Sequence, residues 1–106
     1  MYATIRRYST KTGTTKEIIE GLKRRIEEKF VPTIHDIRGF HTYGILSVGD
    51  NQLVSFSIFE DRQGASESNR KAAEFVSKDP LKDQLSKPEV LEGDLLVLKE
   101  ATAGVR

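Results

Sequence analysis

Three polar residues, His41, Glu60 and Asn69, are candidates for catalysis, the first two by acid–base chemistry and Asn69 by hydrogen bonding. Asn69 occurs in the stretch FEDRQGASESNRKAAEFV, where helical spacing places it among alanines on the face expected to be buried. His41 has an unperturbed pKa near neutrality and could act as a general base, with Glu60 orienting it. Asn69 and Tyr43 could donate hydrogen bonds to an oxyanion. The set predicts proton removal from a small hydroxyl compound.

The space between the second helix and the sheet is the expected pocket for this chemistry. Asn69 lies about 10 Å along its helix at 1.5 Å per residue, which places it level with Tyr43 and Ile58 of the sheet. The expected lining is Tyr43, Phe56, Ile58, Ser68 and Phe75, with Arg7 reaching the upper end as an anion contact. A mostly apolar lining with few polar groups is typical of a small-molecule site.

Each of these residues also has a structural interpretation, and the sequence leaves both open. An asparagine on a helix face is commonly held by hydrogen bonds to the fold. Ser68 can be small so that helix and sheet approach closely, and Tyr43 can pack in the core. Arg7 is also explained as a surface arginine at a strand end. His35 and His41 have no third ligand beside them, so we expect no metal site.

Hydrophobic spacing predicts the elements that must position these residues. Strand formers fill 2–9, and a capping box of Thr14 and Glu17 begins a helix. Its apolar residues recur at helical spacing up to Phe30, and Pro32 is expected to end it. A second helix spans roughly 62–78, and EGDLLVLKE supplies the last strand. The order β-α-β-β-α-β predicts one ferredoxin-like α+β domain over 1–106, an antiparallel sheet with two helices on one face.

A hairpin is expected between the two helices, closing near Gly49-Asp50-Asn51. If Asp50 and Asn51 form a two-residue loop, Val48 pairs with Leu53. His41 then lies across from Glu60. This register places Tyr43, Ile45, Val54, Phe56 and Ile58 on one face of the hairpin.

The last strand predicts a partner for the sheet. Leu95 to Leu98 form an uninterrupted aliphatic run, so an edge strand there would be apolar on both faces. We expect a homodimer in which a second subunit covers this strand and the open sheet face. The alternative is that the leucines lie under the short turn at 80–86.

The composition excludes several classes of function. Seventeen basic and sixteen acidic residues give a net charge of +1, which argues against binding to nucleic acid or an anionic membrane. The absence of cysteine excludes disulfides and thiol catalysis. The N-terminal stretch has no apolar segment after its basic pair, so we expect a cytoplasmic protein.

Several stretches resemble the antibiotic-biosynthesis-monooxygenase-like families of the dimeric α/β barrel superfamily. RGFHTYGIL is similar to the opening of their second strand, SFSIFEDRQGASES to their strand-to-second-helix junction, and GDLLVL to their last strand. The resemblance implies a barrel formed by two sheets at a dimer interface. It also implies a cofactor-independent oxygenase of a phenol-like or quinol-like substrate, so we expect no cofactor. The chain has no tryptophan, so the Asn, Trp and His set that some members use is not carried over.

Two functions from different classes follow, since one fold hosts many activities. The first is the small-molecule oxygenase. The alternative is a non-catalytic dimer that binds a metabolite or has a structural or stress-related role. A third, RNA recognition, shares the element order, but QLVSFSIFE lacks the glycine and basic residue that its third strand needs.

Overall fold

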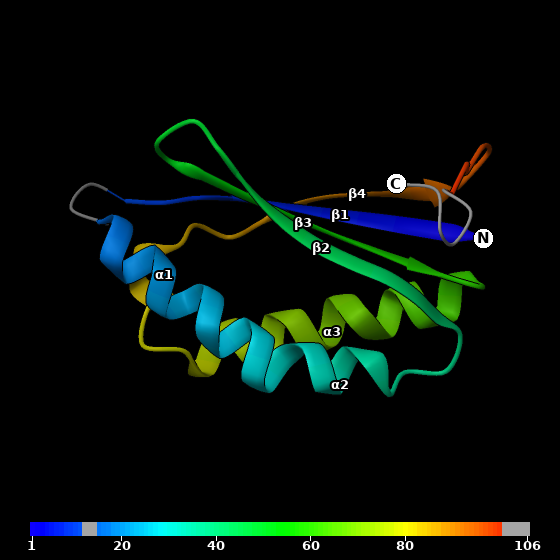
Figure 1. Cartoon of the computed structure of the whole chain (residues 1–106), viewed down its shortest axis with the longest axis horizontal. Coiled ribbons are helices and arrows are strands. Elements are labelled where there is room, and N and C mark those ends of the chain that lie inside the picture. The colour runs from blue at the N-terminus through cyan, green and yellow to red at the C-terminus, as the bar shows by residue number, and fades with distance from the viewer. Residues whose placement is uncertain (12–14, 101–106) are drawn as a thin grey trace.

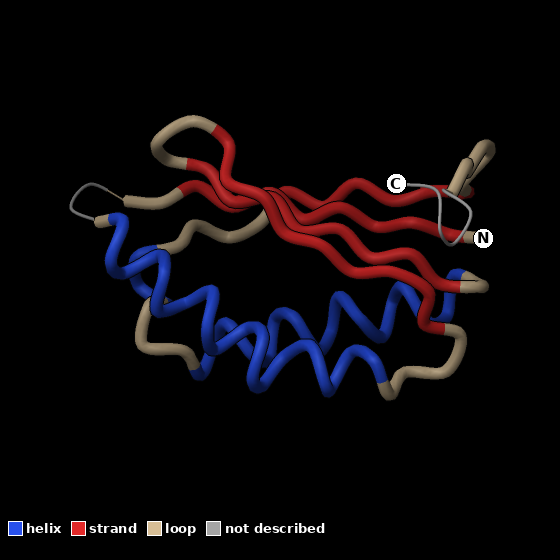
Figure 2. Tube along the Cα trace, viewed as in Figure 1, coloured by secondary structure: helices blue, strands red, loops and turns tan. Residues whose placement is uncertain are grey.

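The computed structural model describes residues 1–11 and 15–100. One antiparallel sheet carries helices on one face (Figure 1), and helices and strands form two separate layers (Figure 2). The elements are β1 (Tyr2–Ser9), α1 (Lys16–Arg25), η1 (Ile26–Phe30), α2 (Val31–His35), β2 (Phe40–Val48), β3 (Gln52–Phe59), α3 (Arg62–Lys78), η2 (Lys82–Gln84) and β4 (Glu89–Asp94). The strand order is β2-β3-β1-β4. The expected ferredoxin-like α+β fold is confirmed.

Side-chain caps begin both long helices. The Thr15 hydroxyl accepts a hydrogen bond from the Ile18 N–H at 3.2 Å, and the Asp61 carboxylate accepts one from the Gly64 N–H at 3.0 Å. Each bond satisfies a backbone donor that has no partner within the helix. The expected cap at Thr14 lies outside the described residues.

The first helical segment continues past Pro32, contrary to the prediction, and ends at His35. The hydrogen-bonding pattern of the helix changes in η1, a π-helical turn. There the Val31 N–H donates to the Ile26 carbonyl five residues earlier. A proline has no N–H to donate, so a wider turn directly before it lets the helix proceed with little loss of hydrogen bonding.

The predicted register of the hairpin is wrong by one residue. Val48 pairs with Gln52, because the turn contains Gly49 as well as the two residues expected, with Gly49 at φ 59°. Tyr43 therefore pairs with Ser57. A shift of one residue moves side chains to the other face of a strand. The three residues moved away from the helices are Val54, Phe56 and Ile58.

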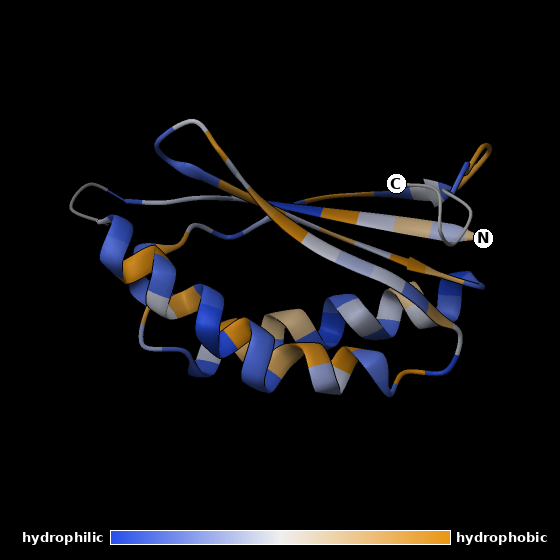
Figure 3. Ribbon diagram, viewed as in Figure 1, coloured by the Kyte–Doolittle hydropathy of each residue, from blue (hydrophilic) through white to orange (hydrophobic). Residues whose placement is uncertain are grey.

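The two faces of the sheet differ in burial. The face under the helices holds the buried residues Thr4, Arg6, Tyr8, Leu53, Ser55, Ser57 and Phe59. The opposite face, which we call the outer face, has four exposed apolar residues, namely Ile5, Leu46, Val48 and Leu91. Figure 3 shows hydrophobic and hydrophilic residues alternating along the helices, as expected for helices that cover a sheet.

The last strand begins and ends earlier than the sequence predicts. β4 pairs with β1 from Glu89 to Asp94, and Asp94 lies opposite Tyr2, where β1 begins. Beyond that point β1 has no further residue to pair with, and the Leu95 N–H bonds to the Met1 carbonyl at 2.9 Å. Residues 95–98 lie outside the sheet as an apolar loop (Figure 3), and Leu96 is 90% exposed. The alternative that this run lies under the turn at 80–86 is wrong.

A partly buried ion pair joins α1 to the segment after α3. Arg25 donates to both carboxylate oxygens of Asp79, with Nε–Oδ1 at 2.7 Å and Nη2–Oδ2 at 3.0 Å. The Leu81 N–H donates to the same carboxylate at 2.9 Å. Burial alone would raise the pKa of Asp79, but these hydrogen bonds and the charges of Arg25 and Lys29 lower it below its usual value.

This ion pair predicts acid sensitivity. The pKa of Asp79 is lower in the folded protein than the ordinary value of about 3.9, so the stabilisation is present above that pH. It is lost as the pH falls through the folded pKa. Asp79→Asn should lower the free energy of unfolding by roughly 1–3 kcal/mol at pH 7, by urea denaturation, and should lose less on acidification. The exposed Asp83→Asn is the control, and an equal effect of both would contradict the assignment.

Candidate functional site

A buried arginine lies at the centre of the helix–sheet layer. Arg6 is 1% exposed. Its Nε donates to Ser55 Oγ at 3.0 Å, Nη2 to Ser57 Oγ at 2.8 Å and Nη1 to Asn69 Oδ1 at 2.7 Å. A longer contact of 3.5 Å joins Nη1 to Ser68 Oγ. All these acceptors are neutral, and no carboxylate of the described residues bonds to the guanidinium.

The strand pattern explains how this arginine is accommodated. Alternation along β1 turns Arg6 toward the helices together with Thr4 and Tyr8. Arg6 pairs with Ser55, and Thr4 pairs with Ser57. Serine is small and its hydroxyl accepts hydrogen bonds, so the two serines leave room on β3 for the guanidinium and supply acceptors for it.

Asn69 connects this arginine to the edge of the sheet. Its Oδ1 accepts hydrogen bonds from Arg6 and from the Thr4 hydroxyl at 3.1 Å, and its Nδ2 donates to Glu92 Oε2 at 3.2 Å. Glu92 also accepts a hydrogen bond from the Tyr2 hydroxyl at 3.2 Å. The carboxylate thus reaches the guanidinium only through the asparagine amide. Asn69 faces the sheet, as expected, but its polar atoms are bonded to the fold.

Burial governs the protonation of the groups near Arg6. Desolvation lowers the pKa of Arg6, which the two nearby tyrosines partly oppose. Burial raises the pKa of Tyr43 to about 12, although the charge of Arg6 acts in the other direction. The pKa of Tyr8 is raised by burial as well. Both tyrosines are therefore neutral near pH 7, so their hydroxyls can donate hydrogen bonds.

A small cavity of about 30 Å³ lies beside this cluster. Its polar lining is Arg6, Tyr8, Tyr43 and Ser55, and its apolar lining is Leu22, Ile26, Phe30, Ile45, Leu53, Ala72, Phe75, Val76 and Leu85. A cavity of this volume holds about one water molecule. Tyr43 and Phe75 line it as the sequence predicts.

The cavity adjoins a larger cleft between α1 and the edge strand β2. This cleft has a volume of about 160 Å³. Leu22, Ile26, Ile45 and Leu53 line both spaces, so they form the boundary between the two. A cavity of about 150 Å³ accommodates benzene, so the cleft has the volume of one aromatic ring.

Phe56, Ile58 and Ser68 do not line the cavity, contrary to the prediction. Phe56 and Ile58 are on the outer face, opposite Gly44 and Thr42 of β2, because of the corrected register. The Phe56 ring lies across Gly44, where a Cβ would come within 2.4 Å of the ring. Ser68 is buried on α3, and its hydroxyl donates to the Ala65 carbonyl at 2.7 Å. It supports Arg6 and does not line the cavity.

The predicted pair of His41 and Glu60 is wrong. A bulge at His41 lets Phe40 pair with Phe59, and the Glu60 N–H bonds to the Gly39 carbonyl at 2.9 Å. His41 Nδ1 lies 2.6 Å from the Thr42 hydroxyl, and Nε2 lies 3.3 Å from Glu100.

Neither His41 nor Glu60 lines the cavity. Arg7 does not reach it either, because Arg7 lies on the outer face and forms an ion pair with Glu89. Within residues 1–11 and 15–100, no group of histidine and acidic residues is placed to hold a metal ion. No helix in the same ranges is long and apolar enough to span a membrane.

Comparison with known proteins establishes the fold. No family model matches the chain, and no curated protein matches its sequence. A protein of unknown function from Nitrosomonas europaea superposes with a TM-score of 0.71 at 20% identity, over 96% of this chain and 95% of that one. A putative antibiotic biosynthesis monooxygenase from the same organism gives 0.66 at 21% identity, over 92% and 100%. A dimeric ferredoxin-like protein from an uncultured marine organism gives 0.65 at 13% identity, over 95% and 100%.

This chain has the fold that these proteins share. The resemblance to the antibiotic-biosynthesis-monooxygenase-like proteins that the sequence indicates is confirmed for the fold over nearly the whole chain.

The network around Arg6 predicts a structural role for Asn69. Asn69→Ala leaves one guanidinium nitrogen without its shortest hydrogen bond, and we expect a loss of roughly 1–3 kcal/mol in the free energy of unfolding. Urea denaturation measures it. The matched control is Ser66→Ala, an exposed position on the same helix, for which we expect less than about 0.5 kcal/mol. Equal stabilities of Asn69→Ala and the wild type would contradict this role.

Proposed function

We propose that the chain binds a small aromatic molecule with an acidic hydroxyl and acts on it as a cofactor-independent oxygenase of the phenol or quinol type. The observation that carries this proposal is the buried Arg6, which has no carboxylate in contact among the described residues and lies at the polar end of an apolar cavity. The ring occupies the cleft between α1 and β2, and its oxygen points toward Arg6.

Proton loss in this site depends on electrostatics. Among the described residues, no histidine, aspartate or glutamate lines the cavity, whereas Glu20 lines the cleft, so no general base lines the end at which the ligand's oxygen meets Arg6. A fixed positive charge beside a phenol favours the phenolate, and the proton can leave to solvent through the cleft. Tyr43 stays neutral because of its raised pKa, and its hydroxyl can donate to the same oxygen. The resulting anion is electron-rich enough to react with oxygen.

The boundary between the cleft and the cavity must open as the ligand binds. The cleft has the volume of one ring, but the cavity beside Arg6 admits only about one water molecule. The shared residues Leu22 and Ile26 belong to the first helical segment. Displacement of this segment from the β2 edge would join the two spaces.

The alternative is a non-catalytic dimer with a metabolite-binding or structural role. Its support is that Arg6 is already bonded to three neutral side chains and that the cavity beside it has a volume of only about 30 Å³. In this case the arginine stabilises the fold only. The two functions differ in whether Arg6 changes the ionisation of a bound phenol.

A chromogenic phenol tests this difference. The pKa of 4-nitrophenol, followed by absorbance in the presence of saturating protein, should fall by about 1–3 on binding to the wild type. Arg6→Gln should abolish that change while its circular dichroism stays native. Arg7→Gln is the matched control, because Arg7 lies next in sequence on the opposite face. An unchanged pKa in the wild type would favour the alternative.

We also propose that a second copy of the chain covers the outer face. Ile5, Leu46 and Leu91 are 38%, 47% and 59% exposed there, which is unusual for three large apolar residues on one face. Leu96, in the apolar loop after β4, is a further exposed apolar residue. The similarity to a dimeric ferredoxin-like protein supports self-association of this chain.

Sedimentation tests the dimer. At micromolar concentration the wild type should sediment as a dimer, and Leu46→Glu combined with Leu91→Glu should sediment as a folded monomer, because charges would be buried unpaired in the interface. The control is Ala73→Glu, an exposed position on the helical side. A monomeric wild type would contradict the proposal.

A further inference from the structure

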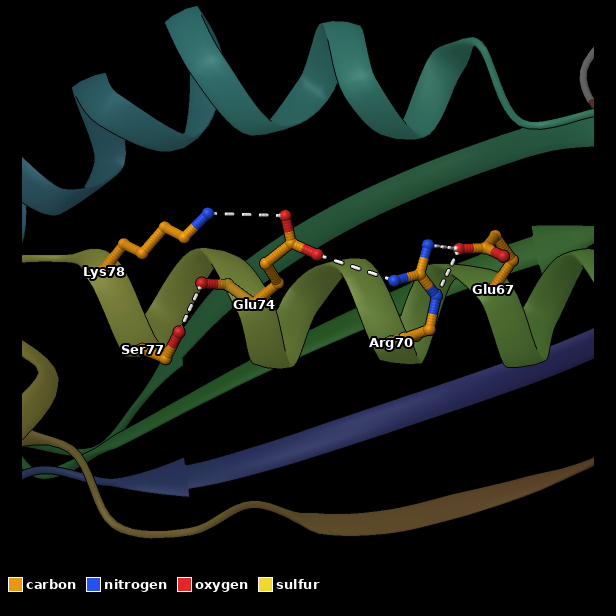
Figure 4. Close-up of polar contacts among 5 residues, drawn as sticks. All are labelled: Glu67, Arg70, Glu74, Ser77 and Lys78. Atoms are coloured by element: carbon orange, nitrogen blue, oxygen red, sulfur yellow. Dashed lines mark hydrogen bonds and ion pairs between the residues drawn. The ribbon is translucent and has the colours of Figure 1, made fainter.

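A groove separates α3 from the helix formed by α1, η1 and α2. Its volume is about 340 Å³. One wall carries Arg25, Lys29 and Thr33, the other carries Lys71, Glu74 and Lys78, and Phe30, Phe75, Asp79 and Pro80 complete the lining. Both walls follow helical spacing, so each presents one continuous row of side chains to the groove. Figure 4 shows Glu74 and Lys78 on the side of α3 nearest the first helical segment.

The groove has more positive than negative charge. Arg25 is neutralised by Asp79. The Glu74 carboxylate forms ion pairs with two residues, because it lies 3.6 Å from Lys78 and 3.5 Å from Arg70. Figure 4 shows both ion pairs. Lys29 and Lys71 remain on opposite walls, and neither has a carboxylate within ion-pair distance among residues 1–11 and 15–100. Lys29 acts on Asp79 only at longer range, where its charge lowers the pKa of that carboxyl, so in the described part of the chain neither lysine forms a close ion pair.

The base of the groove is aromatic. The rings of Phe30 and Phe75 lie with centroids 5.4 Å apart at an interplanar angle of 48°. Both residues also line the small cavity beside Arg6, so they form a wall between the cavity and the groove. Aromatic rings favour offset or edge-on contact with another ring, whereas the two lysines favour an anionic group.

We propose that this groove binds a small aromatic carboxylate, with its rings on Phe30 and Phe75 and its carboxylate between Lys29 and Lys71. The volume is more than twice the roughly 150 Å³ that accommodates benzene, which suits two fused rings with one acidic substituent. This site is distinct from the cavity, because the aromatic wall separates them. The inference does not rest on the oxygenase proposal.

A titration with 2-naphthoate tests the site. Binding to the full chain is followed by calorimetry and by amide chemical shifts. The double variant Lys29→Ala/Lys71→Ala should weaken binding by at least about fivefold, since each exposed ion pair contributes up to about 1 kcal/mol. Raising the salt from low to high concentration should weaken wild-type binding in the same direction. The matched control is Lys82→Ala/Lys87→Ala, which removes the same charge away from the groove and should bind as the wild type does.

The shifts locate the ligand independently of affinity. Perturbed amides should cluster in 25–33 and 71–80, and Lys71→Glu, which reverses one charge, should weaken binding further. Equal binding by the two double variants would overturn the proposal, as would perturbations centred on β1 and β3. The latter result would place the naphthoate in the cavity, whose own test uses 4-nitrophenol and Arg6→Gln. The two proposals can therefore fail separately.

Discussion

The burial of Arg6 is the constraint on which the helix–sheet layer depends. Transfer of an ion from water to the protein interior costs several kcal/mol even after relaxation, and no carboxylate in residues 1–11 or 15–100 compensates it. Neutral oxygens from β3 and α3 surround the guanidinium instead, each within hydrogen-bond distance. These bonds fix where α3 lies over the sheet and require serines where an apolar core would otherwise have larger residues. The polar centre of the layer follows from one residue.

The buried apolar residues around this polar centre form one cluster, which contains two groups of aromatic rings. In the first group Phe30 contacts Tyr43 and Phe75, and in the second Phe40 packs edge-on against Phe59. The cavity is at the boundary between the arginine and the first of these groups. At this boundary a fixed positive charge lies beside apolar walls. Electrostatic interactions are strong in such surroundings, so a small change in the polarity of a ligand changes its binding free energy.

The order of the helices and strands could be predicted from the sequence, but few of the residues of the site could. Alternation and helical spacing predicted β1, α3 and the ferredoxin-like order correctly, because those patterns depend on local chemistry. The predicted register of the hairpin was wrong because of a single turn residue, Gly49. The prediction therefore placed Phe56 and Ile58 on the wrong face of the sheet. Arg6 was missed for a different reason, since a buried arginine and a surface one look alike in sequence. One sequence signal of its burial was available. Arg6 alternates along β1 with Thr4 and Tyr8, and these residues lie opposite the serines of β3.

The contact between Gly44 and Phe56 has a consequence for how this chain can vary. The ring occupies the space that any side chain at 44 would need, so the two positions behave as a single volume shared between neighbouring strands. A larger residue at 44 requires a smaller one at 56, or a ring turned away from the sheet. The size of the residue at position 44 thus limits the size of the residue at 56. The two residues together determine the shape of the outer face at this point.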